Sequence, residues 1–360
     1  MVRATVIPSP SASLETRFYP YPEVENGSIA LRTIASEVCG TDVHLWHGRL
    51  AGVPYPLTPG HVSIGEVAET GGPVYDIEGR PVTPGMTVTF LDVHETCFNC
   101  WYCLVGKAST RCPDRKVYGI TYGAKDGLLG GWSESIYLKP GVKIVPLAKN
   151  VTADQWIGGG CGLPTALHAT DMAEIKLGDR VLILGAGPVG QSLCALAASS
   201  GAGWVGVVDS AENRLNQALN MGADDAIHLN DDIPGKVRAV TGGRGADIVI
   251  EASGNPAAVP AGCELVRDGG RFVIVGQYTD HGDIGINPHL HINKKHLEIR
   301  GCWGSDLSHV WRSMEVISRF GDRFRWENLI TKSYDLDACE QALRDVESRS
   351  VVKAVIRPNG

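Results

Sequence analysis

The segment VLILGAGPVG, residues 181–190, decides the fold of this chain. Its apolar start predicts a buried strand, and its three glycines follow at the point where a helix begins. The first glycine permits a tight turn, the second lets the backbone approach a pyrophosphate, and the third lets the helix pack against the strand. Glycines also punctuate loops that bind nothing, so the context matters. The residues expected to contact a dinucleotide are Gly185, Gly187, Pro188, Val189 and Gly190.

Asp209 ends the next apolar run, WVGVVD, about 20 residues after the glycine turn. A carboxylate there can accept hydrogen bonds from both hydroxyls of an adenosine ribose, and it would repel a 2′-phosphate. This position therefore predicts NAD rather than NADP as the cofactor, with Arg214 flanking the adenosine. The alternative is that Asp209 only caps the following helix.

Strands alternate with helix-length segments on either side of this turn. Such βαβ alternation predicts parallel strands joined by right-handed crossovers, and six strands predict a doubly wound Rossmann sheet in an α/β protein. The predicted strands lie at 181–185, 204–209, 225–229, 246–252, 271–276 and 297–301, with helices at 189–199, 211–221 and 256–266.

The chain before residue 150 has a different texture. Between residues 29 and 145, short β-rich pieces are separated by Gly and Pro, which predicts an antiparallel sheet or partial barrel. After an amphipathic segment at 307–320, the final strand VVKAVIRP suits this first region better than a finished six-stranded sheet. We therefore expect a discontinuous catalytic domain, residues 1–152 and 303–360, and a dinucleotide-binding domain, residues 153–302.

Composition excludes several classes of protein. The 360 residues are 43% hydrophobic and 20% charged, which rules out disorder, collagen and a short disulfide scaffold. A net charge of −7 without a basic stripe disfavours nucleic acid, including a zinc-finger module. No apolar run reaches the roughly 20 residues of a membrane helix, and residues 1–22 have neither the basic start nor the apolar core of an export signal. We expect a cytoplasmic protein with no membrane partner.

Four of the ten cysteines lie close together in the pattern C-x2-C-x2-C-x8-C. Four thiolates can surround one tetrahedral Zn²⁺ and leave no open position, which is typical of a structural site. An iron–sulfur cluster or four unrelated thiols are the alternatives. The cysteines are Cys97, Cys100, Cys103 and Cys112.

Three further residues are far apart in the sequence: Cys39 in VCGTDVH, His61 in PGHVSIGE and Cys161 in GGGCGLPT. Each alone is more simply read as a buried small residue or a satisfied histidine. Together they offer two thiolates and one imidazole, which is the form of a catalytic zinc site with a fourth position for water or substrate.

This combination resembles the zinc-dependent medium-chain alcohol dehydrogenases, which pair a GroES-like catalytic domain with a Rossmann domain, and the resemblance covers nearly the whole chain. It implies a catalytic zinc on Cys39, His61 and Cys161 and a structural zinc on the four clustered cysteines, two Zn²⁺ per chain. It also implies NAD in the cleft between the domains, a small-molecule alcohol or carbonyl substrate, and a homodimer or homotetramer.

The resemblance assigns roles to five more residues. Thr41 matches the residue that hydrogen-bonds the substrate oxygen, and His44 matches the imidazole that passes the proton outward. Asp42 lies behind His61, where a carboxylate would fix the tautomer of the ring. Thr165 matches a contact to the nicotinamide, and Lys353 matches the basic residue that reaches the pyrophosphate.

The sequence departs from the family pattern in two places. Val62 follows His61, where the family usually carries a glutamate behind the zinc. The last interval of the structural set is one residue longer than usual, so we expect the loop 104–111 to bulge, with Gly106 providing the bulge.

Alcohol oxidation requires loss of the hydroxyl proton and transfer of a hydride, and zinc would favour the alkoxide. Family positions predict an apolar pocket for a compact apolar or cyclic secondary alcohol. The alternative is that the pocket positions are core residues. A polyol or amino-alcohol dehydrogenase of the sorbitol or threonine type is the second hypothesis, and a non-catalytic zinc- and nucleotide-binding scaffold is the third. The pocket positions are Trp46, Leu50, Val93 and Trp303.

Overall fold

The computed structural model describes all 360 residues, which form two compact units. Unit 1 contains Met1–Cys161, Asp306–Gly321 and Trp326–Gly360, and unit 2 contains Gly162–Ser305 and Asp322–Arg325. Helix α3 (Ala153–Gly159) belongs to unit 1, whereas the division made from the sequence placed it with the dinucleotide-binding domain. The tertiary reason is that α3 packs on β3 and β4 of unit 1 and on the η4 turn (Trp326–Leu329).

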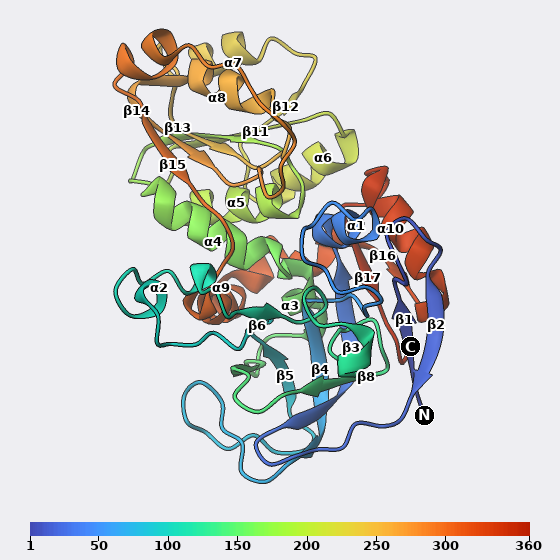
Figure 1. Cartoon of the computed structure of the whole chain (residues 1–360). Coiled ribbons are helices and arrows are strands. Elements are labelled where there is room, and N and C mark those ends of the chain that lie inside the picture. The colour runs from blue at the N-terminus through green and yellow to red at the C-terminus, as the bar shows by residue number, and fades with distance from the viewer. The chain divides into compact units, whose positions relative to one another are not determined.

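Unit 2 is built on a six-stranded parallel sheet, with helices on both of its faces (Figure 1). Every neighbouring pair in the sheet is parallel, and the order places the first strand of the unit at the centre. This confirms the predicted doubly wound sheet. Its order is β12 (Asp225–His228), β11 (Trp204–Asp209), β10 (Arg180–Leu184), β13 (Ala246–Glu251), β14 (Val266–Ile274) and β15 (Glu298–Gly301).

The helices of unit 2 bury small and branched side chains against these strands. Leu182, Val249 and Phe272 are fully buried between the sheet and its covering helices. The sequence predicted α5, α6 and α8 but missed α4 and α7. The helices are α4 (Gly162–Ala173), α5 (Pro188–Ser199), α6 (Glu212–Asn220), α7 (Ile233–Val240) and α8 (Ala258–Leu265), and a π-helical turn spans Pro288–Asn293.

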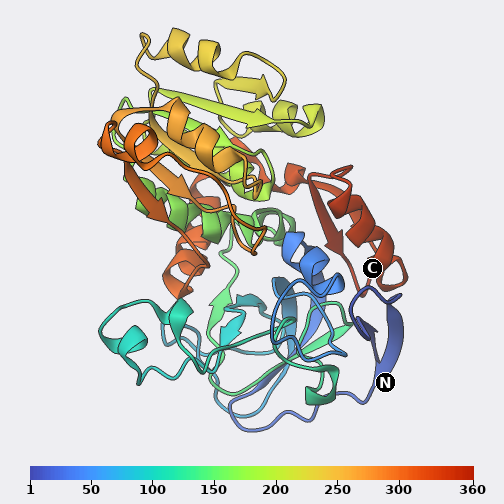
Figure 2. The ribbon, with the colours of Figure 1, turned by 45° about the horizontal axis from the view of Figure 1, so that its top comes forward.

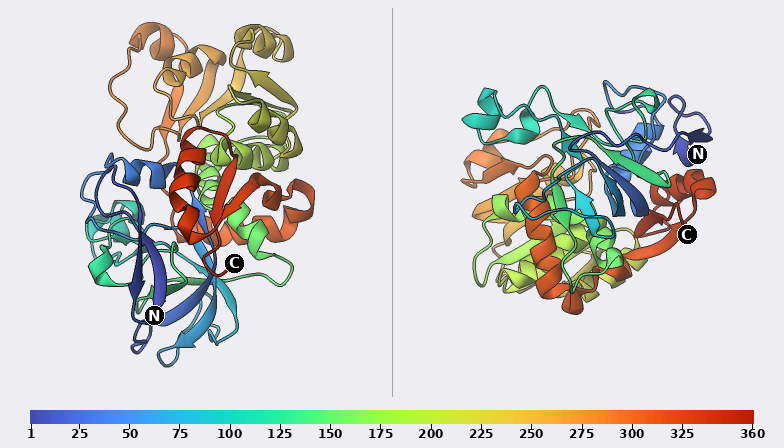
Figure 3. Two further views of the ribbon diagram at one scale, coloured as in Figure 1. Left: turned by 90° about the vertical axis from the view of Figure 1, so that its right-hand side faces the viewer. Right: turned by 90° about the horizontal axis from the view of Figure 1, so that it is seen from below.

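Unit 1 is built on a seven-stranded sheet that the predicted β-rich pieces form together with two C-terminal strands (Figure 3). The last strand runs antiparallel to β3, with Ala354 opposite Val38, so the end of the chain completes the N-terminal sheet. The strands are β16 (Ile330–Tyr334), β17 (Lys353–Ile356), β3 (Ile29–Val38), β4 (Ser63–Thr70), β5 (Thr87–Phe90) and β9 (Ile144–Pro146), with β8 (Ser135–Leu138) on β3.

Smaller elements complete unit 1. Strands β1 (Val2–Val6) and β2 (Glu15–Tyr19) pair with each other, as do β6 (Val93–His94) and β7 (Lys116–Val117). Figure 2 shows the loop that carries α2 (Trp101–Leu104) projecting from the sheet of unit 1. The remaining helices are α1 (Gly40–Trp46), α10 (Cys339–Glu347) and α9 (Leu307–Phe324), of which residues up to Gly321 belong to unit 1. No helix has both the length and the hydrophobicity needed to span a bilayer.

Strand β3 determines where the chemistry of unit 1 gathers. It pairs with β4, β8 and β17, and its end leads directly into α1 through Cys39. Antiparallel pairing with β4 brings residue 36 opposite residue 63, so the segments around residues 37–39 and 61–62 lie next to each other.

Candidate functional sites

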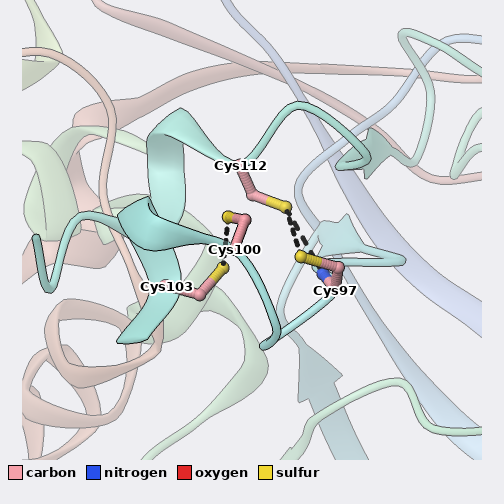
Figure 4. Close-up of side chains that lie close together, drawn as sticks. All are labelled: Cys97, Cys100, Cys103 and Cys112. Atoms are coloured by element: carbon pink, nitrogen blue, oxygen red, sulfur yellow. Dashed lines mark hydrogen bonds between the residues drawn. The ribbon is translucent and has the colours of Figure 1, made fainter. Parts of the chain in front are cut away.

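The four clustered cysteines converge on one point (Figure 4). Cys100 Sγ lies 3.5 Å from Cys103 Sγ, Cys112 Sγ lies 3.5 Å from Cys97 Sγ, and all four sulfurs lie within 4.8 Å of one another. Four sulfurs around a tetrahedral zinc, each about 2.3 Å from the metal, are separated by about 3.8 Å. The donor set therefore fits one zinc ion with no open position.

Backbone geometry shapes this cluster. The N–H of Cys97 donates to Cys112 Sγ at 3.3 Å. Burial raises the pKa of the Cys112 thiol, but backbone N–H donors from Cys97 and Asp114 outweigh it and lower that pKa to about 7. A thiolate is thereby favoured, which is the form that binds zinc.

In the longer loop before Cys112, the left-handed residue is not the expected glycine. The left-handed conformation falls on Lys107, with φ of 51°, and not on Gly106. Gly106 is instead a close-approach position, because a Cβ there would lie 2.7 Å from the Trp101 ring. The prediction that Gly106 supplies the bulge is therefore wrong in its detail.

Cys39, His61 and Cys161 also converge, although they come from three separate segments of unit 1. Their ligand atoms lie within 4.8 Å of one another, and Cys39 Sγ is 3.6 Å from His61 Nε2. A sulfur and a nitrogen bound to one tetrahedral zinc are about 3.6 Å apart. Three donors with this spacing fit a zinc that keeps one position for another ligand.

Asp42 stands behind this set, as the resemblance implies. Its Oδ2 accepts the Cys39 N–H at 2.9 Å, which closes the first turn of α1, and its Oδ1 lies 3.6 Å from His61 Nδ1. Burial opposes protonation of the imidazole, but the Cys39 and Asp42 charges prevail and hold the pKa of His61 well above its ordinary value. The hydrogen bond from Cys161 lowers the pKa of Cys39 to about 6.

Helix α1 places the two residues expected to move the proton. Thr41 and His44 stand three positions apart on α1, so they share one face of the helix next to its Cys39 cap. Both side chains are partly exposed. The segment Gly40–Trp46 that carries them forms about two turns of helix.

The glycine turn of unit 2 has the geometry that a pyrophosphate site requires. Gly185 has φ of 108°, and a Cβ at Gly190 would lie 1.9 Å from the Gly185 carbonyl oxygen. Gly187 caps α5, and a Cβ there would meet only Arg214 Nη1, at 3.9 Å. The second glycine therefore leaves its backbone open, while the other two close the turn onto the helix.

Asp209 is tied to this same turn. Its Oδ2 accepts the N–H of Ala186 at 2.7 Å, and its Oδ1 accepts the N–H of Ala211 at 2.9 Å. The hydrogen bond from Ala211 supports the start of α6. Asp209 therefore also acts as a helix cap, as the alternative interpretation of the sequence proposed. Each carboxylate oxygen retains a lone pair for a ribose hydroxyl.

Two residues are placed otherwise than the resemblance implied. Lys353 is 1% exposed, and its Nζ lies 2.6 Å from Glu37 Oε1, so its charge is already paired within unit 1. Trp46 is 6% exposed in the core of unit 1, donates to Ala12 O at 2.9 Å and lies under Arg344. Burial removes Lys353 from the candidate pyrophosphate contacts and Trp46 from the candidate pocket walls.

The other expected contacts lie in separate parts of the fold. Leu50 packs on the same core as Trp46, and half-buried Val93 pairs with Val117. In unit 2, Thr165 lies on α4, and Trp303 stacks on Tyr278 with ring centroids 5.9 Å apart. These residues keep their predicted roles as proposals.

The sequence reasoning missed Glu37. This residue is fully buried, and its Oε2 accepts the Cys161 N–H at 2.6 Å. The signal was present, because an acidic residue in the otherwise apolar strand end IASEV is costly to bury unless it has a partner.

A doubly wound dinucleotide sheet and two zinc-ligand sets define a zinc-dependent oxidoreductase. Residues 25–149 match the alcohol dehydrogenase GroES-like domain, and residues 188–319 match the zinc-binding dehydrogenase family. The chain is 30% identical over 349 residues to 5-exo-hydroxycamphor dehydrogenase of Pseudomonas putida, which covers 95% of each chain. It belongs to the zinc-dependent medium-chain alcohol dehydrogenases, whose cofactors are zinc and a nicotinamide dinucleotide.

Other relatives broaden the comparison. The L-threonine 3-dehydrogenase of Bacillus licheniformis is 29% identical and covers 97% of this chain and 96% of its own. A solved alcohol dehydrogenase from Thermotoga maritima superposes with a TM-score of 0.94 at 31% identity, covering 99% of both chains. A zinc-binding dehydrogenase from Sinorhizobium meliloti, solved with NADP, gives a TM-score of 0.87 at 25% identity and covers 99% of both.

Proposed function

We propose that this enzyme oxidises a compact apolar or cyclic secondary alcohol to a ketone with NAD as the hydride acceptor. The observation that carries the proposal is the convergence of Cys39, His61 and Cys161 at the start of α1. That helix also presents Thr41 and His44 on one face. An open zinc position beside a hydroxyl and an imidazole is what alcohol oxidation requires.

The residues of this chain divide the work. Zinc, when bound, supplies Lewis-acid stabilisation of the alkoxide, and the dinucleotide accepts the hydride. Thr41 Oγ1 accepts the proton of the substrate hydroxyl as it releases its own, and the His44 imidazole passes the released proton toward water. Asp42 holds the His61 ring in the tautomer that leaves Nε2 free for the metal.

We infer a preference for NAD from Asp209. A 2′-phosphate beside this carboxylate would meet a like charge, whereas the ribose hydroxyls can donate to it. Arg214, close to Gly187, is a cation that could partly offset the repulsion between Asp209 and a 2′-phosphate. The relative solved with NADP makes a direct comparison of the two cofactors necessary.

The substrate proposal is supported by the P. putida relative, because a hydroxycamphor carries its hydroxyl on a saturated ring. The test is NADH formation over primary, cyclic, aromatic and polyhydroxylated alcohols. We expect the highest kcat/KM on cyclic secondary alcohols. The highest value on a polyol, or no turnover of any alcohol by protein with two zincs, would contradict the proposal.

L-Threonine is the second candidate substrate, since several L-threonine 3-dehydrogenases are 25–29% identical to this chain. It belongs in the same panel as an amino alcohol. A kcat/KM for L-threonine above that for cyclohexanol would favour this candidate.

We also propose a homodimer or homotetramer located in the cytoplasm. Edge strand β15 leaves one side of the unit 2 sheet unpaired, which gives a second copy a surface to extend. Six of the ten cysteines belong to the two zinc-ligand sets, which require reduced thiols. Light scattering on the purified protein and fractionation of cells test these two statements.

A further inference from the structure

Glu37 is a fully buried carboxylate that the proposed reaction leaves without a role. Its Oε1 lies 2.6 Å from Lys353 Nζ, and its Oε2 accepts the Cys161 N–H at 2.6 Å. The Cys161 thiol itself lies 3.4 Å from Oε1. A buried ion pair therefore contacts Cys161, one of the three residues of the candidate zinc site that keeps an open position.

Glu37 stands directly across the sheet from Val62. The N–H of Glu37 donates to the Val62 carbonyl at 3.0 Å, and the next residues along each strand, Ser36 and Ser63, are a registered pair of β3 and β4. Position 62 follows a metal ligand and carries no charge here. The neighbouring strand places a carboxylate at the same end of the sheet.

The backbone that leads into Cys161 passes close to the Glu37 and Lys353 side chains. Gly160 has φ of 47°, and a Cβ there would lie 1.9 Å from Glu37 Oε2 and 2.5 Å from Lys353 Nζ. The Lys353 ammonium also contacts the carbonyl oxygens of Ile157 and Gly159, at 3.3 and 3.4 Å, where α3 ends. A cation is favourable at the C-terminal end of a helix. No residue other than glycine would fit at position 160 without displacing the pair.

We propose that Glu37 and Lys353 form the charged pair that positions Cys161 for zinc, and that Glu37 replaces, from across the sheet, the carboxylate that Val62 does not provide. Glu37 is a positioning residue, since it acts through Cys161. The inference rests on the proposed zinc set of Cys39, His61 and Cys161 and does not depend on which alcohol is oxidised. Partners behind a ligand typically change metal affinity by about 10- to 100-fold.

The test measures zinc release from the holoenzyme into excess 4-(2-pyridylazo)resorcinol, whose absorbance reports free zinc. Two phases are expected, one for each zinc, and Cys39→Ser identifies the phase of the open site by losing it. The structural zinc is then an internal control for folding. Because removing one partner of a buried ion pair is strongly destabilising, Glu37 and Lys353 are changed together.

In the double variant Glu37→Gln/Lys353→Met we expect the open-site zinc to leave about 10- to 100-fold faster, with the structural phase unchanged. The exchange variant Glu37→Val/Val62→Glu, which keeps one carboxylate near Lys353, should release this zinc at a rate close to that of the unmodified enzyme. Glu66→Gln, an exposed acid on β4 paired with Arg32, should change neither phase.

The double variant releasing both zincs at the unmodified rates would overturn the positioning role. If Glu37→Val/Val62→Glu releases zinc as fast as Glu37→Gln/Lys353→Met, with the structural phase intact, a carboxylate at position 62 does not substitute for Glu37, and that part of the proposal is overturned. Unmodified enzyme that binds only the structural zinc would instead overturn the zinc set on which the proposed function stands, so the two failures are distinct.

Discussion

Asp209 offers the most direct test of the cofactor assignment, because its carboxylate accepts hydrogen bonds from the glycine turn and from the start of α6. Asp209→Gly removes the acceptors of the Ala186 and Ala211 N–H groups, at 2.7 and 2.9 Å. A net hydrogen bond contributes about 1 kcal/mol, so the free energy of unfolding should fall by about 2 kcal/mol. Ala186 is fully buried, so loss of the acceptor for its N–H should cost more than loss of the acceptor for the Ala211 N–H.

The same substitution should weaken NAD more than NADP. Hydrogen bonds from the ribose hydroxyls to a charged carboxylate contribute about 1.5–3 kcal/mol, which corresponds to roughly a 10- to 150-fold increase in KM for NAD. NADP loses no such bond and gains relief from a like charge. The ratio of kcat/KM for NAD to that for NADP should therefore fall in the variant.

The measurement is initial rates with each cofactor at a fixed saturating alcohol, together with urea unfolding. Asp209→Asn is the matched control, because its amide oxygen keeps one backbone acceptor while the charge is lost. It should be more stable than Asp209→Gly and should still have a lower ratio of kcat/KM for NAD to that for NADP than the unmodified enzyme. Asp209→Gly with an unchanged KM for NAD and an unchanged cofactor ratio would refute the assignment, and Asp209 would then be only a capping residue.

Three further predictions concern unit 1. Metal analysis should find about two zincs per chain. Cys39→Ser should lose one zinc and all turnover. Cys100→Ser should lower the thermal midpoint of unfolding, because a closed zinc site contributes folding free energy. One zinc or fewer in the unmodified protein would contradict this. Thr41→Ala should lower kcat by about 10²- to 10⁴-fold with zinc retained, and His44→Gln should cost less and recover partly at higher pH, where solvent base accepts the proton; full activity in Thr41→Ala would exclude the relay. Trp46→Ala should lower the free energy of unfolding by about 3–5 kcal/mol, measured by urea titration, without changing the ranking of alcohols; an altered ranking in a stable variant would return Trp46 to the pocket.

The structural zinc loop and the glycine turn show how far local sequence reaches. Cys97 and Cys112 stand within one loop, so their meeting depends on short-range turns. The segment 181–190 contains its own strand, turn and helix start. Position 190 requires a glycine because a side chain there would collide with Gly185, five residues earlier. Interactions between near neighbours are visible in a single sequence, which is why these features were predictable.

Trp46 and Lys353 show where such reasoning ends. A large apolar residue next to a site can line a pocket or fill a core, and only the packing of α10 beside α1 puts Trp46 in the core. A lysine at a family position can reach a phosphate or pair with an acid. Its neighbour Glu37 is 316 positions away in the chain, so nothing local could reveal the pair.

By itself, the sequence determined the α/β architecture, the order of the six Rossmann strands along the chain, and the chemical types of the two zinc-ligand sets. Only the tertiary structure decided which charged groups share the buried end of β3. The physical reason is that sheet pairing joins segments without regard to their separation: β17 closes on β3, β4 sets Val62 beside Glu37, and Gly160 leaves the space in which the carboxylate reaches Cys161.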